Sequence, residues 1–143
     1  MLKKILVLIL MCCTFNFMGA QEITEEQWKF WNPIMDALEQ VESGGNKKAV
    51  SPNGKWVGCL QIATICVREV NRILGKQVYT YKDRYSRQKS REMFIIFQEK
   101  YNPERNIERA ARLWNSGDLR CMERKASTNE YYRRFSRFFN LTT

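Results

Sequence analysis

Apolar residues recur every three or four positions in several stretches of the chain, a spacing typical of helices with one buried face. These stretches are 34–41, 65–74, 93–101, 107–114 and 131–139. Gly75 and Gly117 follow two of them, and Asn102 with Pro103 follows a third, as expected at helix ends. The pattern therefore predicts a mainly α domain, whose last helix starts near Thr128.

The segment before residue 34 carries two helix signals in succession. Thr24, followed three positions later by Gln27, forms a capping-box pattern and predicts a helix start. Asn32 and Pro33 then favour a stop, and the same pair suits the N-cap and first turn of a new helix. We therefore expect two helices, with a break at Asn32–Pro33.

Helical spacing disappears between residues 44 and 61, where Gly, Asn, Ser and Pro predominate. This composition predicts an ordered loop, with short strand pairing around 56–60. Gly44 and Gly45 are suited to end the preceding helix. Glu42 is thereby expected at the end of a helix with a buried face, directly before a loop that can fold back over it.

The first 20 residues have the pattern of an export signal. Two lysines precede an apolar core at 5–13, and a small-residue cleavage site ends at Ala20. The core is too short to span a bilayer, so a periplasmic or extracellular protein without a membrane span is expected. Cys12 and Cys13 leave a lipoprotein as an alternative, although bulky residues precede them.

The remaining residues, 21–143, have the size of one domain. The full chain carries a formal charge of +9; without the two signal-peptide lysines, 22 basic residues stand against 15 acidic ones, a charge of +7. Such a charge favours an anionic partner. The basic residues are scattered rather than gathered in one tract, so a solvated basic surface is a better interpretation than a nucleic-acid site.

The chain contains no histidine, which excludes Ser-His and Cys-His catalysis. Cys59, Cys66 and Cys121 remain after cleavage, and this odd number permits one disulfide of undetermined pairing. They are widely separated and form no Cys-x-x-Cys pair, so neither a metal site nor a cofactor is expected.

Four segments, in order along the chain, resemble the motifs of a known family. Residues 42–54, Glu-Ser-Gly-Gly-Asn-Lys-Lys-Ala-Val-Ser-Pro-Asn-Gly, closely resemble the signature of soluble-type lytic transglycosylases, which share the lysozyme-like fold. Gly-Cys-Leu-Gln at 58–61 is similar to the family's Gly-Leu-Met-Gln, and Leu-Trp-Asn-Ser-Gly at 113–117 to its Ala-Tyr-Asn-x-Gly. Thr-Asn-Glu-Tyr-Tyr-Arg-Arg at 128–134 resembles its Glu-Thr-x-x-Tyr-Val segment.

The chain departs from the family pattern in three places. The segment 55–57 is one residue longer than usual between the glycines, Cys59 replaces an aliphatic residue, and Trp114 replaces a tyrosine. These changes leave Glu42, Gln61 and Asn115 in place. They are expected to reshape the substrate groove.

The resemblance implies a role for each matching residue. Glu42 would be the catalytic acid and base, and Ser43 would help to fix it. Gln61 and Asn115 would hydrogen-bond the substrate's acetamido group or orient Glu42, although helix-capping or loop contacts are an equally good interpretation. Tyr131 would contact the glycan or the intermediate, although its helical spacing with later phenylalanines also suits the core.

Cleaving a glycosidic bond requires a carboxylic acid that is still protonated near neutral pH, and burial favours that form. Most glycosidases also use a second carboxylate. Glu39, Asp83 and Asp118 are the candidates, although solvated charges are the ordinary interpretation of all three. Lytic transglycosylases avoid this need, because the substrate's own acetamido group assists and its C6 hydroxyl completes the reaction.

The flat face of an exposed tryptophan can stack on a sugar ring. Trp56, in the glycine-rich loop, is the best candidate for such a contact, and Trp114 is another. Core packing is expected for Trp28 and Trp31.

The sequence thus predicts an exported enzyme that cleaves the β-1,4 bond between N-acetylmuramic acid and N-acetylglucosamine in peptidoglycan, with 1,6-anhydromuramyl ends as products. A hydrolytic muramidase that uses water is one alternative. A non-catalytic wall-binding module, serving an envelope-spanning secretion or conjugation apparatus, is another.

Overall fold

The computed structural model describes residues 22–142 of the chain, with side chains up to residue 140. The predicted signal peptide at 1–20 and the alternative lipidation site lie outside these residues. The helices are α1 (Glu25–Ser43), α2 (Thr64–Leu74), α3 (Arg87–Tyr101), α4 (Ile107–Ser116) and α5 (Asn129–Thr142). Two 3-10 helices, η1 (Tyr81–Tyr85) and η2 (Lys125–Thr128), and two short strands, β1 (Trp56–Val57) and β2 (Ile62–Ala63), complete the set. The predicted mainly α architecture, with a short β segment after the helix that carries Glu42, is confirmed.

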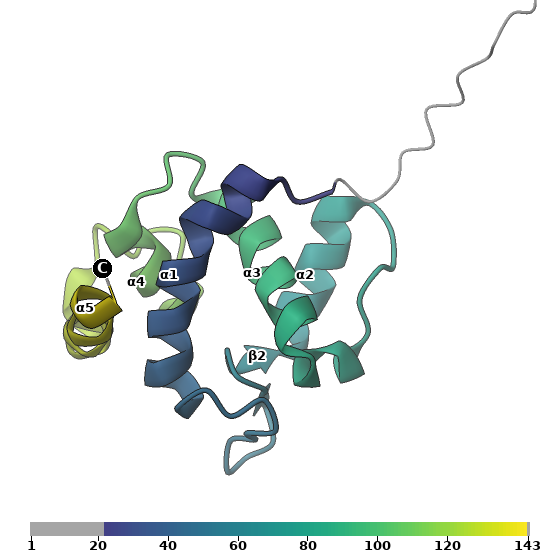
Figure 1. Ribbon diagram of the computed structural model, residues 1–143, viewed down its shortest axis with the longest axis horizontal. Coiled ribbons are helices and arrows are strands. Elements are labelled where there is room, and N and C mark those ends of the chain that lie inside the picture. The colour runs from purple at the N-terminus through teal and green to yellow at the C-terminus, as the bar shows by residue number, and fades with distance from the viewer. Residues whose placement is uncertain (1–21, 143) are drawn as a thin grey trace, which may run out of the picture.

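Helix α1 occupies the middle of the molecule (Figure 1). In that view α4 and α5 lie on one side of it and α2 and α3 on the other, while the hairpin lies near its C-terminal end. The contact between α1 and α5 is the most extensive between any two elements. Within the described residues, no helix combines the length and apolar character needed to cross a bilayer.

The predicted break at Asn32–Pro33 is wrong, because α1 runs through both residues. Proline in a helix interior removes one backbone hydrogen bond and costs about 3 kcal/mol. Tertiary contacts of the two residues that precede Pro33 offset this cost. Trp31 is fully buried and donates from its indole nitrogen to Glu99 at 2.6 Å, and the Asn32 side chain accepts from Arg91 at 3.1 Å. The Thr24–Gln27 capping box is confirmed as the start of α1.

The predicted helix ends at Gly44, Gly75 and Gly117 are confirmed, and each glycine has a positive φ that suits a C-cap. Helix α3 begins at Arg87, six residues before its apolar spacing is visible, because the Ser86 side chain caps it. The two 3-10 helices have no apolar periodicity and were not expected.

The core forms where α1 meets the other helices and the hairpin. It combines residues that are almost inaccessible to solvent from α1, from the turn after β1, and from α2 to α5. Its largest members are Trp31, Ile34, Met35, Leu38, Leu60, Ile62, Met93, Phe94, Ile95, Leu113 and Phe135.

Strands β1 and β2 pair antiparallel, with Trp56 opposite Ala63 and Val57 opposite Ile62. The buried Arg84 of η1 anchors this hairpin by donating to the carbonyl oxygens of Ile62 at 3.1 Å and Lys55 at 3.3 Å. Gly58, in the turn, lies so close to η1 that a Cβ atom there would come within 1.9 Å of the Arg84 carbonyl oxygen.

We expect Gly58→Ala to destabilise the protein by roughly 2–5 kcal/mol. The φ of +84° accounts for about 1–2 kcal/mol, and the collision with Arg84 adds about 1–3 kcal/mol. Gly54→Ala is the matched control, because Gly54 has a φ of +71° and no atom within 4 Å of an added Cβ. Urea unfolding measures both variants, and equal losses would show that the close approach to Arg84 contributes nothing.

Candidate active site

Glu42 lies in the last turn of α1, where α5 packs against it. The Tyr131 hydroxyl of α5 donates a 2.6 Å hydrogen bond to Glu42 Oε1. This bond joins residues 89 positions apart, so two of the four family-like segments meet at the acid. Tyr131 was expected to contact the glycan or an intermediate; in the structure its hydroxyl contacts the acid itself.

The Glu42 carboxyl has the properties of a proton donor near neutral pH. Burial raises its pKa from 4.5 to about 7, while the Tyr131 hydrogen bond and the charge of Arg134 oppose part of this shift. Oε2 accepts no hydrogen bond from the described residues. Among these residues, no fully buried side-chain oxygen or nitrogen lacks a hydrogen-bond partner. Glu42 is only partly buried as a residue, and Oε1 is the oxygen that a hydrogen bond holds in place.

The raised pKa of Glu42 makes stability depend on pH. The folded protein keeps this proton between pH 4.5 and about 7, so the free energy of unfolding should fall as pH rises through that range. The total loss is on the order of 3 kcal/mol. Glu42→Gln cannot ionise, and we expect it to be more stable than the parent at pH 8 but similar to it at pH 4. Urea unfolding at both pH values tests this, and a difference that does not change with pH would contradict it.

Ser43 and Gln61 hold the loop that follows α1. The Ser43 hydroxyl donates to the backbone oxygen of Cys59 at 2.8 Å, which ties the end of α1 to the hairpin turn. The Gln61 amide nitrogen donates to the oxygens of Gly58 at 2.8 Å and Ala49 at 3.4 Å. Gln61 also has a φ of +49°, a conformation that non-glycine residues seldom adopt away from functional or tightly constrained sites.

Asn115 and Trp56 are open to solvent. Asn115 is exposed near the end of α4, and 44% of the Trp56 surface is accessible on β1. Within the described part of the chain, neither Asn115 nor Gln61 bonds to Glu42, so they do not orient the acid here. Their expected contact with a substrate acetamido group stays a prediction.

Trp31 is a core residue and Trp114 packs against the core, in contrast to Trp56. Trp114 packs edge-on against Phe94, with ring centroids 4.9 Å apart, and its indole nitrogen donates to the Leu60 oxygen at 3.1 Å. Trp114 is only partly buried, and its expected stacking on a sugar ring stays a prediction. Trp28 is partly buried against the same core.

The three candidates for a second carboxylate are each engaged elsewhere. Asp83 accepts from the Thr80 backbone at 2.7 Å and pairs with Lys89 at 2.8 Å. Asp118 accepts from the Arg120 backbone at 2.9 Å and pairs with an arginine of the same loop. Glu39 is not the solvated charge expected from the sequence, because only 2% of its surface is accessible.

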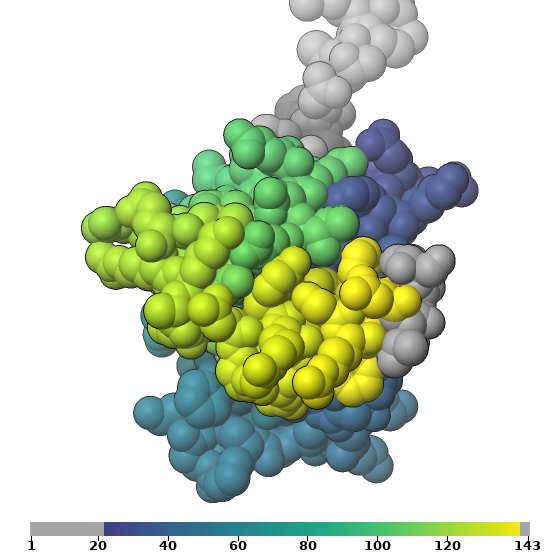
Figure 2. Space-filling view, turned by 90° about the vertical axis from the view of Figure 1, so that its left-hand side faces the viewer, coloured from purple at the N-terminus to yellow at the C-terminus, as the bar shows by residue number. Residues whose placement is uncertain are grey.

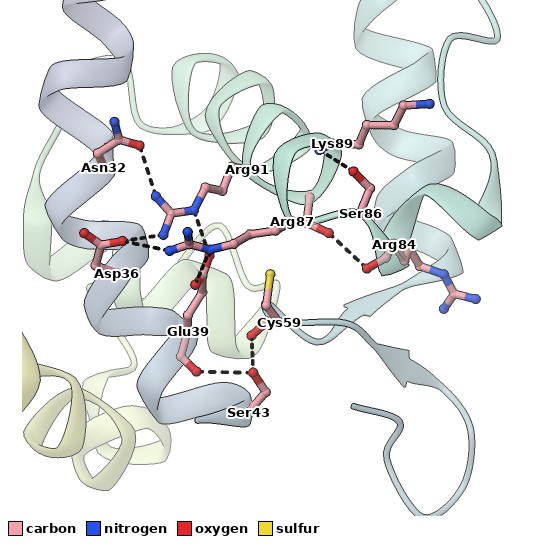
Figure 3. Close-up of polar contacts among 11 residues, drawn as sticks. Asn32, Asp36, Glu39, Ser43, Cys59, Arg84, Ser86, Arg87, Lys89 and Arg91 are labelled. Carbon is pink, nitrogen blue, oxygen red and sulfur yellow. Dashed lines mark hydrogen bonds and ion pairs between the residues drawn. The ribbon is translucent and has the colours of Figure 1, made fainter. Parts of the chain in front are cut away.

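Glu39 belongs to a network of charges between α1 and α3 (Figure 3). Its carboxylate accepts from Arg91 Nε at 2.7 Å and from Arg87 Nε at 2.9 Å. Asp36 pairs with both arginines at the more exposed edge of the network. The network anchors α1 one helical turn before Glu42. Both oxygens of the Glu39 carboxylate are occupied by ion pairs with arginines.

All three cysteines within the described residues are free thiols, so the disulfide that their number permits does not form. Cys59 is buried, and this burial, together with the nearby Glu39 carboxylate, raises its pKa to about 11. A thiol of that kind is unreactive near neutral pH. Residues 22–142 bring no three potential metal-binding side chains together.

Two pockets lie away from Glu42. One, of about 460 Å³, includes Trp28, Tyr79 and Glu92, and the other, of about 420 Å³, includes Tyr101 and Arg109.

Sequence reasoning did not identify Arg134 or the Glu39–Arg91 pair. Arg134 follows Tyr131 by three positions, a spacing that places both on one helix face and could have indicated a shared role. Glu39 follows the buried Met35 by four positions, which was a signal that it faces inward.

Comparison with protein-family models, curated proteins and solved structures finds no match to this chain, so the assignment of its function depends on the site.

Proposed function

We propose that this protein is a peptidoglycan lytic transglycosylase with a lysozyme-like fold. It would cleave the β-1,4 bond between N-acetylmuramic acid and N-acetylglucosamine and leave 1,6-anhydromuramyl ends. The observation that carries this proposal is the Glu42 carboxyl, with its pKa of about 7, one oxygen held by Tyr131 and the other without a hydrogen bond to any described residue. The four family-like sequence segments supply the substrate class.

In the first step Glu42 acts as the acid. Its second oxygen, Oε2, gives a proton to the glycosidic oxygen as the bond to C1 of the muramic acid breaks. At a pKa of about 7, half of the molecules hold this proton at neutral pH. The oxygen of the substrate's acetamido group attacks C1 and stabilises the cation that forms there.

In the second step the same carboxylate acts as the base. It removes the proton from the C6 hydroxyl, whose oxygen attacks C1 and releases the acetamido oxygen. No water molecule is consumed, and the carboxyl returns to its protonated form. The engagement of Glu39, Asp83 and Asp118 in other contacts supports this one-carboxyl mechanism over hydrolysis by two carboxylates, which would need a second acid near Glu42.

The loop and helix residues around the acid would bind the sugar. Gln61 and Asn115 carry amides suited to the acetamido group, and Trp56 offers an exposed ring face for stacking. Ser43 would hold the loop against α1. The net positive charge suits the anionic bacterial wall, where an exported protein, periplasmic or extracellular, would meet its substrate.

Incubation with purified, washed peptidoglycan tests the activity. We expect the supernatant to accumulate soluble muropeptide fragments at a rate proportional to enzyme concentration. Each sample is centrifuged, so that the protein bound to the pellet is measured along with the fragments released. Protein that sediments with the wall and releases no fragments would contradict catalysis and indicate a binding module.

A further inference from the structure

Helix α5 contacts the end of α1 through two side chains that are one helical turn apart. Tyr131 donates to Glu42 Oε1 at 2.6 Å, and Arg134 donates from Nη2 to the carbonyl oxygen of Val41 at 3.0 Å. Val41 immediately precedes Glu42. Figure 2 looks onto α5, in yellow, with the chain that follows α1 below it in blue and teal. The two bonds fix both the acid's side chain and the backbone next to it.

Arg134 forms no ion pair with a carboxylate of the described residues. Glu42 is the acid close enough for its pKa to be lowered by the Arg134 charge. Its neighbour Arg133 differs, because it pairs with Glu130 on the exposed side of α5. Helix α1 has no basic residue in its own last turn, where the helix dipole is negative and disfavours a carboxylate. Arg134 supplies the missing positive charge from another helix.

Few charged or titratable groups surround Glu42 within the described part of the chain. Tyr131 and Arg134 face it from α5, and Tyr131 stays neutral because burial and the nearby carboxylate raise its pKa well above 10. On α1, the Glu39 carboxylate is directed into its pairs with Arg87 and Arg91. Arg134 is therefore the cation that acts on Glu42.

We propose that Arg134 is a positioning residue for Glu42: its hydrogen bond fixes the end of α1, and its charge stabilises the Glu42 carboxylate that must accept a proton in the second step. The catalytic part of this inference rests on the proposed function, whereas the effect on Glu42 ionisation does not. Without Arg134, the acid form would be favoured, so Glu42 would give up its proton less readily in the first step and the carboxylate left by that step would be less stable.

The test is the titration of the Glu42 side-chain carboxyl carbon, followed by NMR in the free protein. We expect Arg134→Gln, which keeps a hydrogen-bond donor but removes the charge, to move the midpoint up by at least about 0.5 pH units. Arg134→Lys should restore most of the parent value. Arg133→Gln is the matched control, since it removes a neighbouring charge that does not contact Glu42, and it should leave the midpoint unchanged.

The inference is overturned if Arg134→Gln titrates like the parent, or if Arg133→Gln moves the midpoint as far. The lysis rate is then measured against pH for the same variants, where the limb assigned to Glu42 should move with the titration. A titration that shifts as expected in a protein that releases no wall fragments would reject the proposed function but retain the role of Arg134.

Discussion

Glu42→Gln is expected to slow wall lysis by about 10²–10⁴-fold. Glutamine is nearly the same size and can still accept the Tyr131 hydrogen bond, but it can neither give a proton to the glycosidic oxygen nor take one from the C6 hydroxyl. Both steps of the proposed reaction therefore lose their proton carrier. The initial rate of soluble fragment release, at equal protein concentration and pH 7, is the measurement.

Glu104→Gln is the matched control, because it makes the same chemical change at an exposed position in the loop between α3 and α4. It should keep the parent rate. Circular dichroism and urea unfolding show whether the Glu42 variant is folded, and at pH 8 it should be the more stable protein. A folded Glu42→Gln variant that lyses walls as fast as Glu104→Gln would remove Glu42 from the mechanism.

Glu39→Gln is expected to lower the free energy of unfolding by about 3–5 kcal/mol. The change leaves Arg91, which is 7% accessible, without its buried counter-charge, and burying an unpaired cation is costly. Activity would fall as well, because the network holds α1 one turn before the acid. Urea unfolding at neutral pH measures the loss.

Asp36→Asn is the control for this prediction. Asp36 pairs with the same Arg91, but 48% of its side chain is accessible, so solvent screens the interaction. An exposed pair contributes about 0–1 kcal/mol, and the loss should be correspondingly small. Equal losses from Glu39→Gln and Asp36→Asn would contradict the view that the buried half of the network carries the stability.

Local signals in the sequence were sufficient to predict most helix ends. Thr24 with Gln27, and the glycines at 44, 75 and 117, act through backbone hydrogen bonds to near neighbours, so they can be interpreted without a structure. The break at Pro33 was predicted on the same local basis and is wrong. Its outcome was decided by Trp31 and Asn32, whose partners lie about 60 or more positions along the chain.

The candidate site was predictable in its members but not in its contacts. Glu42 and Tyr131 were identified from the resemblance to family motifs, yet nothing in the sequence indicated that they bond to each other. That contact depends on how α5 packs against α1. The ion pairs of Glu39 depend in the same way on the packing of α3. A carboxylate at the edge of an apolar helix face can lie in solvent or pair with a buried arginine, and the sequence alone does not distinguish the two.

One carboxyl is proposed to cleave the glycan without water, and digestion of wall material in H₂¹⁸O distinguishes this reaction from hydrolysis. We expect muropeptides that end in 1,6-anhydromuramic acid, are lighter than reducing ends by one water and contain no ¹⁸O at that end. Reducing ends labelled with ¹⁸O would show that water completes the reaction and would rule out the proposed mechanism.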